Sequence, residues 1–314
     1  MKNRPLILDT DGGVDDAQAL LMLIGAGFTP DAITTVFGNV GLEAATKNIL
    51  TTLAVAGVEA PVHMGADRPL SQPIIDATYV HGDDGLGGAP RPDVIASPAG
   101  RDAVQYLRET FRRANETGDR VDILMIGPLT NLALALRLEP SIVDGIGTLT
   151  IMGGTVYGRG NTTPAAEFNI FADPEAAGIV FGAEIETIVV PWEPCVTHKM
   201  EGPEVDALLD TIPDSPLKVF SKALVEHARQ ISVGFGAGDN FKFVDPLAAA
   251  VVIDPTIMTQ SVTASVDVAL APGLTRGMTV VNPSQRLGTP PVTLLEHANV
   301  DAVVAIYAKS LIAS

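Results

Sequence analysis

Four aspartates, Asp9, Asp11, Asp15 and Asp16, lie within eight consecutive residues, directly after the apolar run at residues 6–8. Carboxylates held this close raise each other's pKa and destabilise a fold unless a cation lies among them. Oxygen ligands suit hard divalent cations, so Ca²⁺ is the first candidate and Mg²⁺ the second. One aspartate at a helix start is normally an N-cap, which stabilises the helix by about 1 kcal/mol. Four together favour a metal site instead.

Other polar residues follow apolar runs in the same way. Gly38-Asn39 follows the run at residues 32–37, and Gly- or Pro-rich turns follow the runs at 121–126, 148–152 and 185–190. The carboxyl ends of the strands of an open parallel sheet share one edge, and ligands bind there. We therefore expect the aspartates, Asn39 and the segment after Met152 to meet. Glu167 and Asn169 alternate, which would place both side chains on one face of an extended segment.

The order of apolar patterns along the chain indicates how these residues are positioned. Short runs rich in β-branched residues alternate with longer Ala- and Leu-rich stretches of helical period at 16–24, 42–55 and 130–137. Asp173 before Pro174 is typical of an N-cap followed by the first helical residue, so a helix should begin at Pro174. Strands alternating with helices predict an α/β fold. We expect a single domain, residues 1–314, with a mostly parallel, doubly wound sheet and helices on both faces.

Two longer segments lie outside this alternation. Residues 60–98 are rich in Pro, Gly and Asp and include His81, and long loops of this kind near a ligand edge are often lids. Residues 203–243 suggest one or two amphipathic, peripheral helices. The glycine-rich stretch at 234–238 would let this region move over a site.

Composition limits the partners and the compartment. The chain has 314 residues, of which 46% are hydrophobic, and a formal net charge of −17. Its 20 Lys and Arg residues are dispersed, which argues against nucleic acid and against an anionic membrane surface. Cys195 is the only cysteine, so an intrachain disulfide and a cysteine-based zinc site are both excluded. With no secretory signal and no apolar membrane span in the sequence, we expect a cytoplasmic protein.

Six motifs, in order from about Leu6 to the region of Val280, together resemble the inosine-uridine-preferring nucleoside hydrolase family. They are Asp9-Thr10-Asp11-Gly12-Gly13-Val14-Asp15-Asp16-Ala17, Phe37-Gly38-Asn39, His81-Gly82 with Gly85-Leu86-Gly87, Gly127-Pro128-Leu129-Thr130-Asn131, Met152-Gly153-Gly154, and Ala166-Glu167-Phe168-Asn169 before Asp173-Pro174-Glu175. The resemblance implies calcium-dependent hydrolysis of the N-glycosidic bond of ribonucleosides to ribose and free base. It also implies assembly into homodimers or homotetramers.

The resemblance assigns roles to particular residues. Asp11, Asp16 and Asp245 would bind calcium through their side chains, and Ile126 through its main-chain carbonyl. Asp11 would also be the general base toward the attacking water. The remaining implied substrate contacts are Asp15, Asn39, Asn161, Glu167 and Asn169 for the ribose hydroxyls, Met152 in the pocket lining, and His81 beside the base.

Two positions depart from the family pattern. Gly12 stands where the signature usually has proline, which should loosen the loop because proline fixes φ and glycine does not. Val244 stands before Asp245, where related enzymes carry a histidine thought to protonate the leaving base. Valine cannot donate a proton, so another group would act as the acid. The candidates are His227, Arg229 and Gln230.

Two alternative functions deserve comparison. The loop from Leu8 to Gly13 also resembles the Asp-x-Asp-Gly nucleophile loop of haloacid-dehalogenase-like phosphatases, but the spacing to the Gly238-Asp239 segment is too long. A non-catalytic nucleoside- or ribose-binding protein is suggested by Val244. All the expected metal ligands are nevertheless present, which favours the hydrolase.

Overall fold

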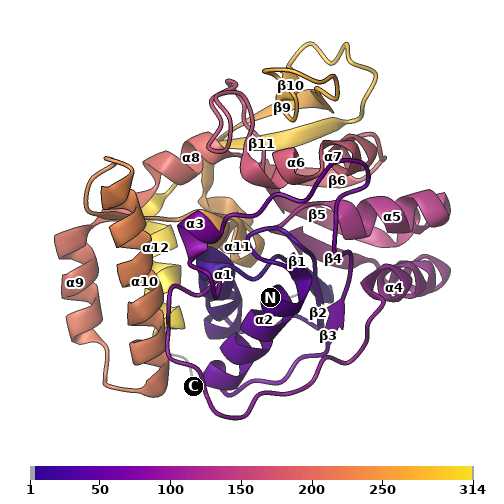
Figure 1. The fold of residues 1–314 in the computed structure, drawn as a ribbon. Helices are drawn as coiled ribbons and strands as arrows, with labels where there is room; N and C mark the ends of the chain where they lie inside the picture. Colours follow the sequence, from indigo (N-terminus) through magenta and orange to yellow (C-terminus); the bar gives the residue numbers. More distant parts are fainter. Residues whose placement is uncertain (1–3, 313–314) are drawn as a thin grey trace.

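A nine-stranded sheet, with the strand order β10-β9-β11-β6-β5-β4-β1-β2-β3, forms the centre of the protein (Figure 1). This computed structural model describes residues 4–312. Across the sheet, the strands β3, β2, β1, β4, β5, β6 and β11 are parallel to one another. Strand β9 is antiparallel to its two neighbours, β11 and β10. Their bounds are β1 (Leu6–Thr10), β2 (Ala32–Thr35), β3 (Val62–Met64), β4 (Val121–Met125), β5 (Ile146–Met152), β6 (Glu186–Val190), β9 (Met258–Val268), β10 (Thr279–Asn282) and β11 (Pro291–Ala298).

Helices cover both faces of this sheet, as predicted (Figure 1). Strand β1 shows why, because its alternate side chains enter two separate cores: Leu6 and Leu8 join one, and Ile7 joins the other. The helices over the first core are α1 (Val14–Gly25), α2 (Leu42–Ala56), α11 (Asp245–Ile253) and α12 (Val300–Ser310). Those over the second are α4 (Ala103–Thr117), α5 (Thr130–Leu138) and α7 (Pro174–Phe181), with the 3₁₀ turn η1 (Pro140–Gly145).

The predicted strand and helix positions agree with the structure to within a few residues, and α7 begins at Pro174 as expected. The Asp173 carboxylate accepts a hydrogen bond from the Ala176 N–H at 3.1 Å, which confirms its role as the N-cap. One local prediction was wrong. Glu167 and Asn169 do not share an extended segment, because Glu167 is the N-cap of the short helix α6 (Phe168–Ala172) and Asn169 lies within that helix.

The first long segment contains more regular structure than predicted, whereas the second forms the helices that were predicted. The first includes β3 and the one-turn helix α3 (Thr78–His81). The second forms two helices, α9 (Gly202–Thr211) and α10 (Pro216–Gly234), and then β8 (Asn240–Lys242), which pairs with β7 (Lys199–Glu201). Two short elements complete the chain, α8 (Trp192–Thr197) and η2 (Pro255–Ile257).

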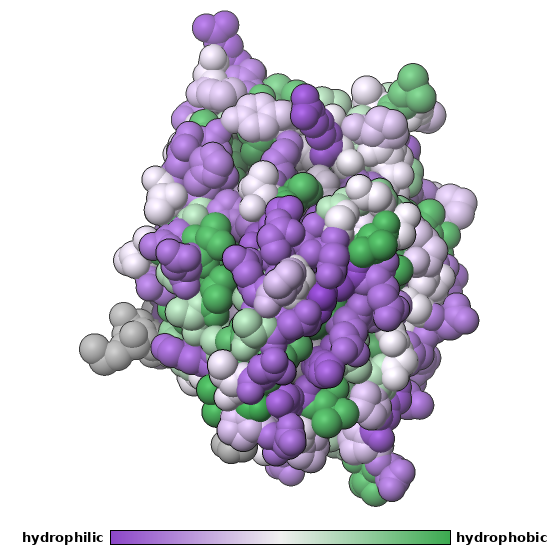
Figure 2. Space-filling view, turned by 90° about the vertical axis from the view of Figure 1, so that its left-hand side faces the viewer, coloured by the Kyte–Doolittle hydropathy of each residue, from purple (hydrophilic) through white to green (hydrophobic). Residues whose placement is uncertain are grey.

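Helix α10 is amphipathic and peripheral, as predicted. Leu217, Phe220 and Leu224 are buried on its inner face, whereas Lys222 and Glu226 are exposed. Figure 2 views the molecule from the side of α9 and α10 and shows mainly hydrophilic side chains with small, separate apolar patches. Within residues 4–312, no helix has the length and apolarity needed to cross a membrane.

Candidate active site

The predicted residues meet at the carboxyl edge of the sheet. Asp11 follows β1, Asn39 follows β2, Ile126 follows β4, and Met152 ends β5. A cavity of about 390 Å³ opens at this edge, within the usual range for ligand pockets. Its lining includes Asp15, Asn39, His81, Ile126, Met152, Asn161, Glu167, Asn169, His227, Val244 and Asp245.

A group of carboxylates lies beside the cavity. Carboxylate oxygens of Asp15, Asp16 and Asp245 lie within 4.8 Å of one another. The expected metal ligands were instead Asp11, Asp16 and Asp245, so the observed group differs by one member. Asp11 is fully buried, and both of its oxygens accept hydrogen bonds from Asn39, at 2.7 Å from the main-chain N–H and 2.9 Å from the amide Nδ2.

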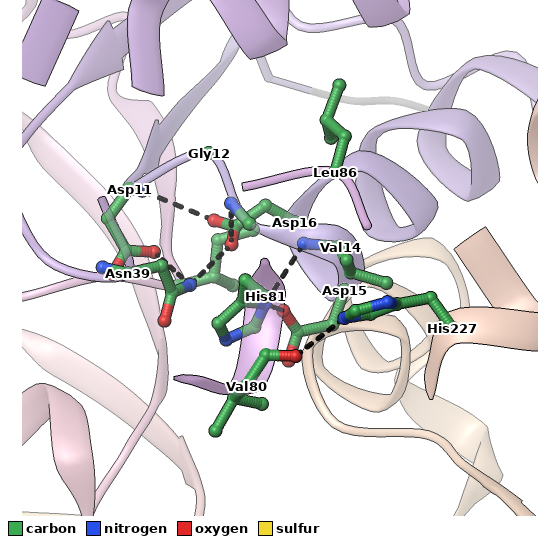
Figure 3. A network of polar contacts seen from close by, with 12 residues as sticks. Asp11, Gly12, Val14, Asp15, Asp16, Asn39, Val80, His81, Leu86 and His227 are labelled. Carbon is green, nitrogen blue, oxygen red and sulfur yellow. Dashed lines mark hydrogen bonds and ion pairs between the residues drawn. The ribbon is translucent and has the colours of Figure 1, made fainter. Parts of the chain in front are cut away.

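Local backbone geometry holds the cluster in place (Figure 3). Asp16 lies in the first turn of α1, where its Oδ2 accepts from the Gly13 N–H at 2.7 Å and from Asn39 Nδ2 at 3.0 Å. Its Oδ1 accepts from the Thr10 hydroxyl and from the Asp11 N–H. The N-cap of α1 is Gly13, so Asp16 is not the N-cap; it lies in the first turn and accepts from the Gly13 N–H, and it is also part of the carboxylate cluster.

Burial is the main cause of altered ionisation here. It raises the pKa of Asp15 to about 6 and, with the charge of Asp16, raises the pKa of Asp11 well above its ordinary value. Burial and the charge of Asp15 act in the same direction on the pKa values of Asp16 and Asp245. Asp15 Oδ1 has no hydrogen-bond partner among the described residues. Uncompensated carboxylate oxygens in this arrangement fit a divalent cation with oxygen preference.

Two of the residues expected to hold ribose, Glu167 and Asn169, line the same cavity. Glu167 accepts from the N–H groups of Gly154 and Asn169, both at 2.9 Å, and burial raises its pKa to about 7. Asn169 Nδ2 donates to the carbonyls of Ile126 and Met152, both at 3.1 Å. The Ile126 carbonyl, an expected metal ligand, therefore accepts a hydrogen bond from the Asn169 amide.

Asn161 lies further out than the other expected ribose contacts. It is an exposed residue at the cavity rim, and its Oδ1 accepts from the Phe168 N–H at 2.8 Å.

His81 reaches the site from α3 and is 7% exposed. Its Nδ1 accepts a hydrogen bond from the Val14 N–H at 3.1 Å, so the neutral ring carries its proton on Nε2 (Figure 3). Burial, opposed by the charge of Asp16, lowers the pKa of His81 to about 4. The hydrogen bond to the Val14 backbone fixes the ring, which also lines the cavity.

The three candidates for the leaving-group acid have different environments. His227 lines the cavity, and its Nε2 lies 2.8 Å from the Val80 carbonyl, which joins α10 to α3. Arg229 forms ion pairs with Asp206 and Asp239, and neither it nor the exposed Gln230 lines the cavity.

Sequence reasoning missed several cavity residues. Gln18 lines the wall one helical turn after Val14, on the same face of α1, so the helical period from the aspartate motif was the available signal. Lys242 lies two residues before Val244, and strand alternation would have placed it on the same side. The aromatic lining, for which no local pattern was available, comprises Tyr79, Phe168, Trp192, Phe235 and Phe241.

Comparison with known proteins agrees with this geometry. The family model described as inosine-uridine preferring nucleoside hydrolase matches residues 6–308. The chain is 38% identical to the inosine-uridine preferring nucleoside hydrolase of Leishmania major, over 89% of this chain and 88% of that protein. Among solved structures, a plant nucleoside hydrolase, PpNRh1, superimposes with a TM-score of 0.88 at 30% identity, covering 99% of both chains.

A purine-preferring ribonucleoside hydrolase from Gardnerella vaginalis also superimposes with a TM-score of 0.88, at 25% identity and 98% coverage of both chains. The likeness extends over almost the whole length of each protein, so it includes the sheet edge and the aspartate motif. The chain therefore belongs to the inosine-uridine preferring nucleoside hydrolase family.

Proposed function

We propose that this protein hydrolyses the N-glycosidic bond of ribonucleosides, giving ribose and free base, with calcium as its metal. The observation that carries the proposal is the group of three carboxylates, two buried and one partly buried, beside a cavity of about 390 Å³. Family membership supports the reaction, since the relatives named above are nucleoside hydrolases. The all-oxygen donor set supports calcium over softer metals.

The metal would be held by Asp11, Asp16, Asp245 and the Ile126 carbonyl, with Asp15 as a further carboxylate in reach of the group. When bound, a divalent cation would orient a water and two ribose hydroxyls and make the water more acidic. Asp11 is our proposed general base, because its raised pKa makes the carboxylate a better proton acceptor. Asp15 is the rival, because it lines the cavity and its Oδ1 accepts no hydrogen bond, although His81 Nδ1 lies 3.6 Å from it.

The remaining polar residues would act on the sugar. Asn39, Asn161 and Asn169 carry amides, which donate and accept as vicinal hydroxyls do. Glu167 and the aspartates would offset positive charge on the ribose ring as the C1′–N bond breaks. Met152 and His81 would line the space between ribose and base. These assignments rest on the common cavity and on the family resemblance.

Ribose release from a panel of purine, pyrimidine and nicotinamide ribosides, with calcium and with excess chelator, tests this proposal. We expect release that depends on calcium, and loss of turnover in Asp11→Ala with the fold retained. Full activity of Asp11→Ala alongside an inactive Asp15→Ala would transfer the role of base to Asp15. Calcium binding without release from any riboside would favour a nucleoside-binding protein, and phosphate release in a parallel assay would favour a phosphatase.

We further propose that the protein works in the cytoplasm as a homodimer or homotetramer. The single, buried Cys195 supports a reducing compartment. The oligomer follows from the family resemblance, and size-exclusion chromatography with light scattering measures it directly. A monomer at micromolar concentration would overturn that part.

A further inference from the structure

Gln18 is a buried polar side chain without a hydrogen-bond partner. The residue is 2% exposed and lines the active-site cavity, and neither Nε2 nor Oε1 has a partner among the described residues. Native proteins rarely leave both ends of a carboxamide unpaired, because burial without a partner is destabilising. A ligand group that donates and accepts side by side would satisfy it.

Lys242 supplies a positive charge to the same cavity. It is the one Lys or Arg side chain among the described residues that line it. Asn240, Lys242 and Val244 all line the cavity, as does Phe241, whereas Phe243 lies only in the first core. Lys242 therefore lies on the same side of the chain as Val244, the position from which the expected acid is missing.

The contacts of Lys242 leave its charge uncompensated. Its Nζ lies 3.4 Å from the Ser232 hydroxyl, and it forms no ion pair within the part of the chain that the structure describes. Burial and the neighbouring Lys199 lower its pKa, which makes the ammonium a better proton donor. Lys199, by contrast, pairs with Glu201 at 2.8 Å and does not line the cavity.

We propose that Gln18 and Lys242 form the subsite for the leaving base: Gln18 hydrogen-bonds a base edge with adjacent donor and acceptor atoms, and Lys242 donates to the departing base. This inference rests on the proposed ribohydrolase function. The substrate class is nucleosides of purines or pyrimidines that carry such an edge. Of the earlier candidates for the acid, Arg229 pairs with two aspartates and Gln230 is exposed. His227 lines the cavity, but its Nε2 is engaged at 2.8 Å from the Val80 carbonyl.

The proton and electron balance of the step is simple. The C1′–N bond breaks, its electron pair goes to the base nitrogen, and the water oxygen bonds to C1′. The Lys242 ammonium gives a proton to the base. The water proton taken by the general base returns to solvent, from which Lys242 is protonated again. One water is consumed, and ribose and neutral base are released.

Two substrates separate base recognition from the sugar and metal chemistry. Inosine needs a hydrogen-bonded or protonated leaving base, whereas the nitrophenolate of 4-nitrophenyl riboside departs without help. We expect Gln18→Met and Lys242→Met to lower kcat/KM for inosine by about 10- to 100-fold and to leave 4-nitrophenyl riboside within about 3-fold of wild type. Lys242→Arg should recover part of the inosine activity if its role is charge. Lys222→Met is the control, because Lys222 is exposed on α10 and does not line the cavity, and it should change neither substrate.

Thermal unfolding gives a second readout for Gln18. Gln18→Met removes an unpaired buried amide at similar volume, so Tm should stay equal or rise while inosine turnover falls. Equal losses on both substrates would overturn the proposal and assign the residues to the sugar or metal site. Unchanged inosine turnover would overturn it as well. If the wild-type protein hydrolyses neither substrate, the proposed function itself fails.

Discussion

Gly12 has a φ of +67°, which proline cannot adopt. Its N–H donates to the Thr10 hydroxyl at 3.2 Å, and a Cβ placed on it would lie 2.6 Å from the backbone of Ala45. Glycine therefore suits the backbone path of this loop, which the proline of the family signature does not fit. The expectation that glycine loosens the loop stays a prediction.

Gly12→Ala should therefore lower the free energy of unfolding by about 3 kcal/mol or more, from backbone strain and from the clash with Ala45. Gly57→Ala is the control, because Gly57 has a similar φ of +65° with no atom within 4 Å of its Cβ, and it should cost about 1–2 kcal/mol. Gly12→Pro should destabilise further. Urea denaturation measures all three, and a Gly12→Pro protein as stable as wild type would contradict the backbone path.

Asp15 allows a test of the metal site without substrate. Asp15→Asn removes one charge from the carboxylate group, so the metal-free protein should be more stable than wild type. The increase in Tm on adding calcium should shrink. Asp9→Asn is the control, because Asp9 is buried nearby but its Oδ2 accepts from Asn131 at 2.8 Å, and it should keep the calcium effect. Differential scanning fluorimetry decides between them, and an undiminished calcium shift in Asp15→Asn would remove Asp15 from the site.

At the scale of single residues, Asp15 and Asp16 could be grouped from the sequence because they are neighbours along the chain, whereas Asp245 was implied only by the family resemblance. Asn39, Ile126, Glu167 and Asn169 were found through their positions at strand ends and through the family motifs. Gln18 and Lys242 were missed, because neither residue type indicates a site by itself. The two residues share a site only because α1 and β8 line the same cavity.

At the scale of elements, Asp173 joins α7 to two other segments. Its Oδ1 caps α7, while its Oδ2 accepts from the Leu70 N–H at 3.0 Å and the Thr130 hydroxyl at 2.7 Å. Asp173→Ala should lower the free energy of unfolding by about 2–4 kcal/mol, because it leaves three donors without an acceptor. Asp102→Ala removes an exposed N-cap, that of α4, and should cost about 1 kcal/mol. Equal losses in chemical denaturation would show that the extra bonds of Asp173 contribute nothing.

The βαβ order was predictable because the spacing of apolar residues along the chain changes sharply between strand and helix. The antiparallel pairing of β9 with β10 and β11 was not predicted, since it depends on contacts between residues 11 to 40 positions apart rather than on local pattern. Helix α6 was missed for a different reason. It has five residues, and its N-cap is a glutamate, so it lacks both length and a usual start signal.

At the scale of the whole molecule, the interior concentrates negative charge that folding must accommodate. Burial raises the pKa of Asp9 to about 7, of Asp15 to about 6 and of Glu167 to about 7. Unfolded aspartate and glutamate ionise near pH 4, so between about pH 4 and pH 7 the folded protein binds more protons than the unfolded chain. The stability contributed by these groups is present below pH 4 and is lost as pH rises through 6 to 7.

His81 acts in the opposite direction, because its pKa is lowered to about 4 and folding therefore disfavours its protonated form. The carboxylates outnumber it, so without metal the Tm should fall as pH rises from 5 to 8. A divalent cation replaces the protons among the carboxylates, so calcium should raise Tm more at pH 8 than at pH 5. Scanning calorimetry in chelator and in calcium at both pH values measures this. The same calcium shift at pH 5 and pH 8 would show that the buried carboxylates do not bind the metal in competition with protons.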